Sequence, residues 1–188
     1  MTEPRFKTLT PETMTPEQRR VAEAIVKGPR GGMRGPFNAL LRSPGLADAA
    51  QKLGEHVRFK VSLPAPLREL AILLTARHWT AQYEWYAHNR IAREAGLAPA
   101  ICEAIAEEKK PAAMSADEAI VYEFCSELLG TTQMSDATFT KARERFGEAG
   151  VMELTGTCGY YSLVAMVLNV DRQPIPEGAV PLKALRRG

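Results

Sequence analysis

The segment from Leu67 to Ala95 contains neither proline nor glycine, and this feature most restricts the fold. Its composition favours helix throughout, because leucine, alanine, glutamate and arginine lose little side-chain freedom in a helix. Gly96 ends the segment. The stretch HVRFKVSL alternates like a strand, but the chain offers no second alternating run to pair with it. We therefore expect a helix end and an extended connector there, and an all-α protein.

Capping residues, proline and glycine divide the rest of the chain into further helical stretches. Thr15 is a predicted N-cap, with Pro16 at the first helical position and Gln18 completing a capping box. Ser115 and Glu118 repeat this pattern. The seven predicted helices lie within residues 14–28, 45–59, 67–95, 98–110, 115–130, 135–147 and 150–170. We expect one domain over residues 15–171, an all-α bundle of about seven helices, between irregular tails over 1–14 and 172–188.

Composition limits the classes of function. With 188 residues, 45% hydrophobic and 24% charged, the chain is ordinary for a soluble globular protein. A net charge of +2 is too small to favour a nucleic-acid or membrane partner. The N-terminus lacks the apolar core of a signal peptide, and no run of about 18 apolar residues predicts a membrane span. We therefore expect a cytoplasmic protein. Cys102, Cys125 and Cys158 have no zinc-like or C-x-x-C spacing, so buried, reduced thiols are predicted.

The stretch WTAQYEWYAHNRIA places Glu84 and His88 four residues apart on the predicted helix. With Ala81 at zero on a helical projection, Glu84 falls at about 300° and His88 at about 340°. Trp85 and Ala92 fall in the same apolar arc. The charged residues Arg90, Arg93 and Glu94 lie on the opposite arc. An acid and an imidazole that face inward are desolvated, and such an environment shifts pKa values as a proton-transfer site requires. A structural buried pair, for instance at a subunit contact, and a surface ion pair are the alternatives.

Glu69 is a third candidate for the same site, since Ile72, Leu73 and Ala76 surround it at helical spacing. On one straight helix, about 28 Å would separate Glu69 from His88. The two can cooperate only if the helix breaks or if one of them comes from another subunit. Thr80 is a plausible N-cap for a second helix after a break near His78 and Trp79.

The order Glu69, Ala81, Glu84, His88 resembles the core of the carboxymuconolactone decarboxylase and alkyl hydroperoxidase D superfamily. In the peroxidase branch the pattern is a Glu, eleven residues, Cys-x-x-Cys, three residues and a His. The spacing matches throughout, but Ala81 and Glu84 stand where that branch has cysteines. Thiol peroxidase chemistry needs a thiolate and a resolving partner, so this departure argues against a hydroperoxidase. Further stretches that resemble the decarboxylase-like branch are REL, GPFNALLRSPGLAD, YEWYAH and GYYSLVAMVLN, within roughly residues 35–170.

The resemblance implies the helical fold of that superfamily, assembly as a homo-oligomer (trimer or hexamer), and a carbon–carbon lyase that decarboxylates a small carboxylated lactone without metal or other cofactor. Loss of carbon dioxide leaves negative charge that must be stabilised and then protonated. On this hypothesis His88 donates the proton or stabilises charge, Glu84 fixes its tautomer, and Glu69 completes the relay. The side chains predicted to bind the substrate are Arg34, Arg42, Arg77 and Trp85, the arginines because guanidinium groups bind carboxylates in a bidentate manner.

A second hypothesis belongs to another class of function. The apolar C-terminal helix and the aromatic residues near position 85 would serve equally well in a non-catalytic helical oligomer that binds a ligand. The inward Glu84 and His88 would then bridge subunits. Activity on lactones favours the lyase, and reductant-dependent activity on hydroperoxides favours a peroxidase. The absence of activity on both lactones and hydroperoxides favours the non-catalytic binding protein.

Overall fold

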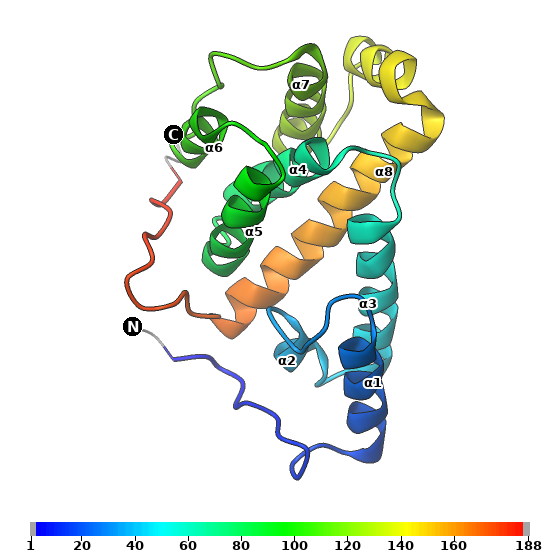
Figure 1. Cartoon of the computed structure of the whole chain (residues 1–188), viewed down its shortest axis with the longest axis vertical. Helices are drawn as coiled ribbons and strands as arrows, with labels where there is room; N and C mark the ends of the chain where they lie inside the picture. The colour runs from blue at the N-terminus through cyan, green and yellow to red at the C-terminus, as the bar shows by residue number, and fades with distance from the viewer. Residues whose placement is uncertain (1–2, 186–188) are drawn as a thin grey trace.

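The computed structural model describes residues 3–185, which form eight helices and no strand, so the predicted all-α class is confirmed. Figure 1 shows the longest helix, α8, crossing the molecule diagonally, with α4 and α5 on one side and α1 and α3 on the other. The helices are α1 (Pro16–Lys27), α2 (Phe37–Leu40), α3 (Pro44–Phe59), α4 (Ala65–His78), α5 (Gln82–Glu94), α6 (Pro99–Ala106), α7 (Ala116–Thr131) and α8 (Asp136–Asp171).

Both predicted capping boxes are confirmed. The Thr15 side chain accepts from the Gln18 backbone N–H, and the Gln18 side chain bonds back to Thr15. Ser115 and Glu118 do the same at the start of α7. Each box satisfies two of the backbone donors that a helix N-terminus leaves unpaired, which is why these two starts could be located from local sequence.

The number of helices differs by one from the prediction. One additional element is α2, a single turn inside the loop that follows the glycine-rich stretch. The helix predicted over 67–95 is divided into α4 and α5. The predicted helices over 135–147 and 150–170 are joined in α8, but Gly147 has a φ of 70° and interrupts the helical backbone between them. Glycine tolerates this left-handed conformation because it has no Cβ. HVRFKVSL continues α3 as far as Phe59 and then forms a connector without strand structure, as predicted.

The predicted break between Glu69 and His88 is also present. Helix α4 ends at His78, and Thr80 has a left-handed φ of 46°. Thr80 was predicted as the N-cap of the next helix, and this is wrong. The extended conformation that an N-cap needs belongs to Ala81, whose φ is −79° and ψ is 93°. The chain reverses at this point, so α5 packs back along α4.

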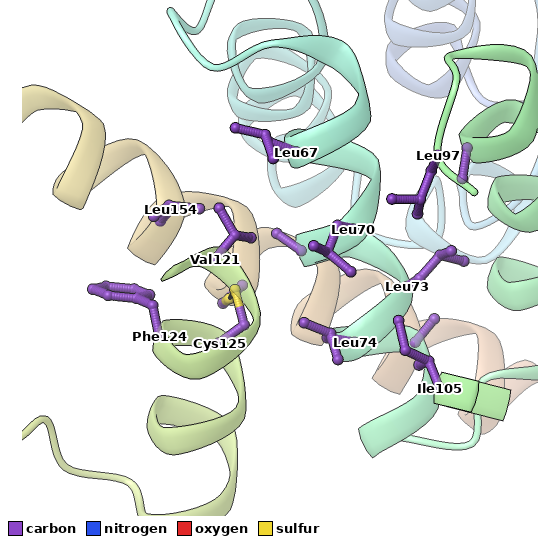
Figure 2. Packing of buried hydrophobic residues seen from close by; sticks show 14 of the residues in the cluster. Leu67, Leu70, Leu73, Leu74, Leu97, Ile105, Val121, Phe124, Cys125 and Leu154 are labelled. Carbon is purple, nitrogen blue, oxygen red and sulfur yellow. Dashed lines mark hydrogen bonds between the residues drawn. The ribbon is translucent and has the colours of Figure 1, made fainter. Parts of the chain in front are cut away.

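Helix α4 is buried on nearly every side, because α5, α7 and α8 all pack against it. Figure 2 shows Leu70 and Leu74 of α4 pointing into the main core, which Val121 of α7 and Leu154 of α8 complete. A buried leucine side chain contributes about 1.5–3 kcal/mol through removal of its apolar surface from water. The site residue Glu69, on the same helix, is therefore carried by one of the most firmly packed elements of the fold.

Residues 3–14 and 173–185 contain no helix or strand, and both stretches are tied to the bundle. The Arg5 and Phe6 backbone N–H groups donate to Asp171, and Gln82 forms two hydrogen bonds with the Leu182 backbone. The predicted tails include residues 1–2 and 186–188, which lie outside the described residues.

By length and composition alone, α8 could cross a membrane, although no uninterrupted run of about 18 apolar residues predicts such a span. Half of its most apolar 18-residue window is buried inside the molecule, as is usual for a core helix. The apolar character of α8 is therefore weak support for membrane insertion.

Candidate active site

Two carboxylates hold the imidazole of His88, one at each ring nitrogen. The Nδ1 atom lies 2.7 Å from Oε2 of Glu69, and the Nε2 atom lies 3.0 Å from Oε1 of Glu84. Glu84 comes from the same helix, one turn earlier, whereas Glu69 reaches the ring from α4. The break at Thr80 therefore unites the three side chains within one subunit, and no second chain is needed to complete the relay.

All three side chains face the interior, as the helical projection of α5 predicted. Glu69 is 1% exposed, and Glu84 and His88 are each 5% exposed. Trp85 and Ala92, which share the inward arc, are buried as well. A surface ion pair at helical spacing is therefore excluded. Three buried ionisable groups are costly to desolvate, and their mutual hydrogen bonds offset that cost.

The charge state of His88 follows from its neighbours. Burial by itself lowers the pKa of His88, but the charge and hydrogen bonds of Glu84 and Glu69 outweigh burial and raise it to about 9. At neutral pH the ring is therefore an imidazolium that donates from both nitrogens. Arg68 adds a second positive charge, since its Nε lies 3.9 Å from the other Glu69 oxygen. Two positive and two negative groups thus balance one another.

A cavity of about 340 Å³ lies beside this cluster, and Glu84 and His88 both line it. Its size is at the lower end of the range for small-molecule sites. Glu69 is not among its lining residues and lies behind the ring. Other walls come from the glycine-rich loop before α2, from the end of α3 and from α8, where Tyr160 and Tyr161 contribute.

The cavity is rich in arginine. Arg30, Arg34 and Arg58 line it and form no ion pair with any carboxylate of residues 3–185, whereas Arg90 pairs with Glu94. Because Glu69 and Glu84 are already neutralised by His88 and Arg68, three guanidinium groups remain uncompensated around a small space. Such a cavity favours an anion, and a carboxylate is the ligand that a guanidinium binds in a bidentate manner.

Arg30 is held in place by several contacts. Its Nη2 donates to the Tyr160 hydroxyl at 2.9 Å, and its guanidinium lies 5.0 Å from the centre of the Phe37 ring. The Nε of Arg30 is buried and has no partner among the described residues. Gly54 of α3 makes this packing feasible, because a Cβ there would collide with the Tyr160 hydroxyl and the Arg30 guanidinium. The glycine therefore has a local role in shaping the cavity wall.

Only one of the four predicted substrate-binding residues lines the cavity beside His88. Arg34 lines the cavity. Arg42 instead donates to the Asn38 and Lys7 carbonyls, and Arg77 is buried in an ion pair with Glu108. Trp85 belongs to the main core and borders a different hollow. The last three side chains do not line the cavity beside His88.

Arg30, Arg58, Tyr160 and Tyr161 were not predicted as site residues. A double tyrosine within an otherwise apolar stretch, GYYSLVAMVLN, was the available signal for the last two. Buried hydroxyls need partners, so tyrosines inside an apolar helix indicate a polar site nearby. Arg30 and Arg58 carried no such signal, since a loop arginine and an arginine in a last helical turn are both common on surfaces.

The three cysteines are free and buried, as predicted. The Sγ atoms of Cys125 and Cys158, which are 33 positions apart in the sequence, lie 3.5 Å apart between α7 and α8. Neither of these two thiols lines the cavity beside His88. Both belong to the main core, so the pair does not replace the missing Cys-x-x-C of the peroxidase pattern.

Within residues 3–185, no group of three or more His, Cys, Asp or Glu side chains is arranged so that it could hold a metal ion. Comparison of the chain with models of known protein families finds no match. Comparison with curated proteins finds no match either.

Proposed function

We propose that this protein is a carbon–carbon lyase of the carboxymuconolactone decarboxylase type, which removes carbon dioxide from a small carboxylated lactone without a cofactor. The observation that carries the proposal is the buried Glu69–His88–Glu84 cluster beside a cavity lined by three uncompensated arginines. The cluster stores a proton and the arginines attract an anion. These are the two requirements of a decarboxylation that ends in protonation of carbon.

The route of the proton follows from the hydrogen bonds. Both nitrogens of His88 already donate to carboxylates, so the imidazolium has no third proton to aim at a substrate. Glu84 accepts from Nε2 and also lines the cavity. We therefore assign the delivery step to Glu84, which takes the Nε2 proton and passes it to the substrate carbon. Glu69 holds Nδ1 and raises the proton affinity of the ring from behind.

The arginines would perform the binding step. A carboxylate of the substrate on Arg30 or Arg34 would be charge-paired, and the carboxylate to be lost would lie towards the apolar side of the cavity near Val164. Desolvation of a carboxylate favours its loss as neutral carbon dioxide, because the charge then spreads into the lactone ring. Positively charged walls would also raise the association rate for a small anion.

The direct test is turnover of 4-carboxymuconolactone by the purified protein, followed as release of carbon dioxide. The wild type and the control His56→Gln, which changes an exposed histidine outside the cavity, should be active. The Glu84→Gln variant should lose most of the activity. A panel of related carboxylated lactones should be included, because the cavity defines charge and size more closely than ring structure. No release from any of them would contradict the proposal.

The second candidate function is a non-catalytic oligomer that binds an anionic ligand. The same three arginines favour it, since they would hold a carboxylate whether or not chemistry follows. Calorimetric binding of a lactone carboxylate without turnover would support this candidate. Turnover of a hydroperoxide that depends on a thiol reductant would instead support a peroxidase. The test therefore includes both substrates, with and without reductant.

Assembly as a trimer or hexamer belongs to the same proposal. Helix α8 leaves Met152, Met166 and Val170 exposed to solvent in the single chain. Exposed large apolar side chains on one helix are consistent with a subunit contact. Sedimentation of the purified protein at micromolar concentration would measure the oligomeric state, and a monomer would contradict this part of the proposal.

A further inference from the structure

Tyr161 of α8 presents a buried hydroxyl that no residue of the described chain satisfies. The side chain is 2% exposed, and its hydroxyl has no hydrogen-bond partner among residues 3–185. The adjacent Tyr160 differs, since its hydroxyl accepts from Arg30. Buried hydroxyls are nearly always bonded, and one that is not lowers the stability of the fold. The exception at Tyr161 therefore calls for a partner that the chain does not supply.

The place of Tyr161 indicates what that partner is. Its ring meets the ring of His88 edge to face, with centroids 5.0 Å apart, and it lines the cavity that Glu84 and His88 share. A ligand in this cavity would therefore lie beside both Glu84 and Tyr161. An oxygen atom of that ligand is the natural acceptor for the hydroxyl.

The protonation state is also suited to donation. Burial, together with the charge of the nearby Glu84 carboxylate, raises the pKa of Tyr161 well above its ordinary value. The hydroxyl therefore keeps its proton at neutral pH. A neutral donor held in a buried site stabilises charge that appears on an acceptor, without requiring rearrangement during the reaction.

We propose that the Tyr161 hydroxyl donates a hydrogen bond to the lactone carbonyl oxygen of the bound substrate and stabilises the negative charge that decarboxylation places there. This inference rests on the proposed function. The bond between the ring carbon and the departing carboxylate breaks, and its electron pair spreads to the carbonyl oxygen as carbon dioxide leaves. Tyr161 keeps its proton throughout. Glu84 protonates the ring carbon, the carbonyl re-forms, and the cluster regains a proton from solvent.

The kinetic test is the Tyr161→Phe variant, which removes only the hydroxyl oxygen. We expect kcat on the lactone to fall by about 10²-fold, with a smaller change in KM, because the bond strengthens as charge develops. The matched control is Tyr122→Phe, since Tyr122 lies on α7 away from this cavity and should leave kcat unchanged. Full kcat in Tyr161→Phe would overturn the proposal.

A stability measurement separates this role from a structural one. If the hydroxyl is reserved for a ligand, Tyr161→Phe should keep or raise the Tm of the free protein, because an unsatisfied buried group is removed. A Tm that falls in Tyr161→Phe but not in Tyr122→Phe would show that the hydroxyl serves the fold through a bonded water. That result would overturn the proposal.

A third readout does not depend on turnover. Protein labelled with carbon-13 at the tyrosine ring carbon that bears the hydroxyl gives only five resonances, since the chain has five tyrosines. A saturated lactone dicarboxylate, which binds but cannot lose carbon dioxide through a conjugated ring, should shift the Tyr161 resonance. A shift in a protein that turns over no lactone would contradict the proposed function and support the donor role. No shift at saturating analogue would overturn the donor role, whatever the activity.

Discussion

Glu69 lies 2.7 Å from the imidazole of His88, although nineteen positions separate them in a segment without proline or glycine. The break at Thr80 converts one helical segment into two antiparallel neighbours. The short distance has a chemical consequence, because it places a carboxylate on each side of one buried ring. The resulting imidazolium is the proton store on which the proposed decarboxylation depends.

The two carboxylates should differ in their effects when each is changed to the neutral amide. Glu84→Gln keeps the hydrogen-bonding shape but carries no proton, so we expect kcat to fall by about 10²- to 10⁴-fold at every pH. Glu69→Gln removes charge from behind the ring, so the loss at neutral pH should be smaller. Its activity should decline at lower pH than that of the wild type. Profiles of kcat/KM against pH would measure both, and identical profiles would contradict the assigned roles.

Stability should depend on pH through His88. Its pKa is raised to about 9 in the folded protein, against an ordinary value of 6.5. The folded state therefore binds the proton more tightly, so the stabilisation is complete below about pH 6.5 and is lost as the pH rises through about 9. Between about pH 6.5 and about pH 9, the free energy of unfolding should fall by roughly 3 kcal/mol. Urea unfolding at several pH values would measure it.

The control for that measurement is the double variant Glu69→Gln/Glu84→Gln, in which no carboxylate raises the proton affinity of the ring. We expect its free energy of unfolding to lose the decline between neutral pH and about pH 9. His56→Gln should retain the wild-type decline, because His56 is exposed and lies outside the cluster. A wild-type stability that is constant over this range would contradict the charge state assigned to His88.

The arginines should separate into binding and structural groups. Arg34→Met should raise KM by about 10- to 100-fold, because a charge-assisted hydrogen bond from this cavity-lining arginine to a substrate carboxylate contributes about 1.5–3 kcal/mol. Arg42→Met should leave KM unchanged and lower the free energy of unfolding by about 1 kcal/mol, since Arg42 bonds backbone carbonyls of Asn38 and Lys7. Equal effects of the two substitutions on KM would show that the cavity arginines do not bind the substrate carboxylate.

The packing of Arg30 can be tested without changing any polar group. In Gly54→Ala the new Cβ collides with Arg30 and Tyr160, so both must move. We expect KM to rise and the fold to lose stability by about 1–3 kcal/mol. Gly45→Ala, in the same helix, is the matched control, since a Cβ there meets nothing within 4 Å. That control should be neutral or slightly stabilising. Unchanged KM in Gly54→Ala would contradict the role of Arg30.

The helical class and the inward pair could be predicted from sequence because they rest on local rules. Capping at Thr15 and the shared face of Glu84 and His88 depend on residues within one or two turns. The approach of Glu69 required knowledge of the backbone at Thr80, which reverses the chain in a left-handed conformation that residue type alone does not indicate. The sequence indicates that Glu69 can reach His88 only if the helix breaks between them. It does not show that the break is present.

The walls of the cavity could not be predicted in the same way. Arg30 and Arg58 approach His88 only because α3 and the glycine-rich loop pack beside α8, and such contacts leave no periodic signal. Arg77 was predicted to bind substrate because guanidinium groups bind carboxylates, but it does not line this cavity. In the folded chain it points away and pairs with Glu108. Long-range packing therefore decided which arginines line the cavity.

The charge state of the ring between Glu69 and Glu84 can be measured directly. A nuclear magnetic resonance titration of protein labelled with nitrogen-15 in histidine would follow only three rings, since the chain has His56, His78 and His88. We expect His88 to remain an imidazolium through neutral pH, with both ring nitrogens protonated, and to titrate near pH 9. A neutral ring at pH 7, with a single protonated nitrogen, would contradict it.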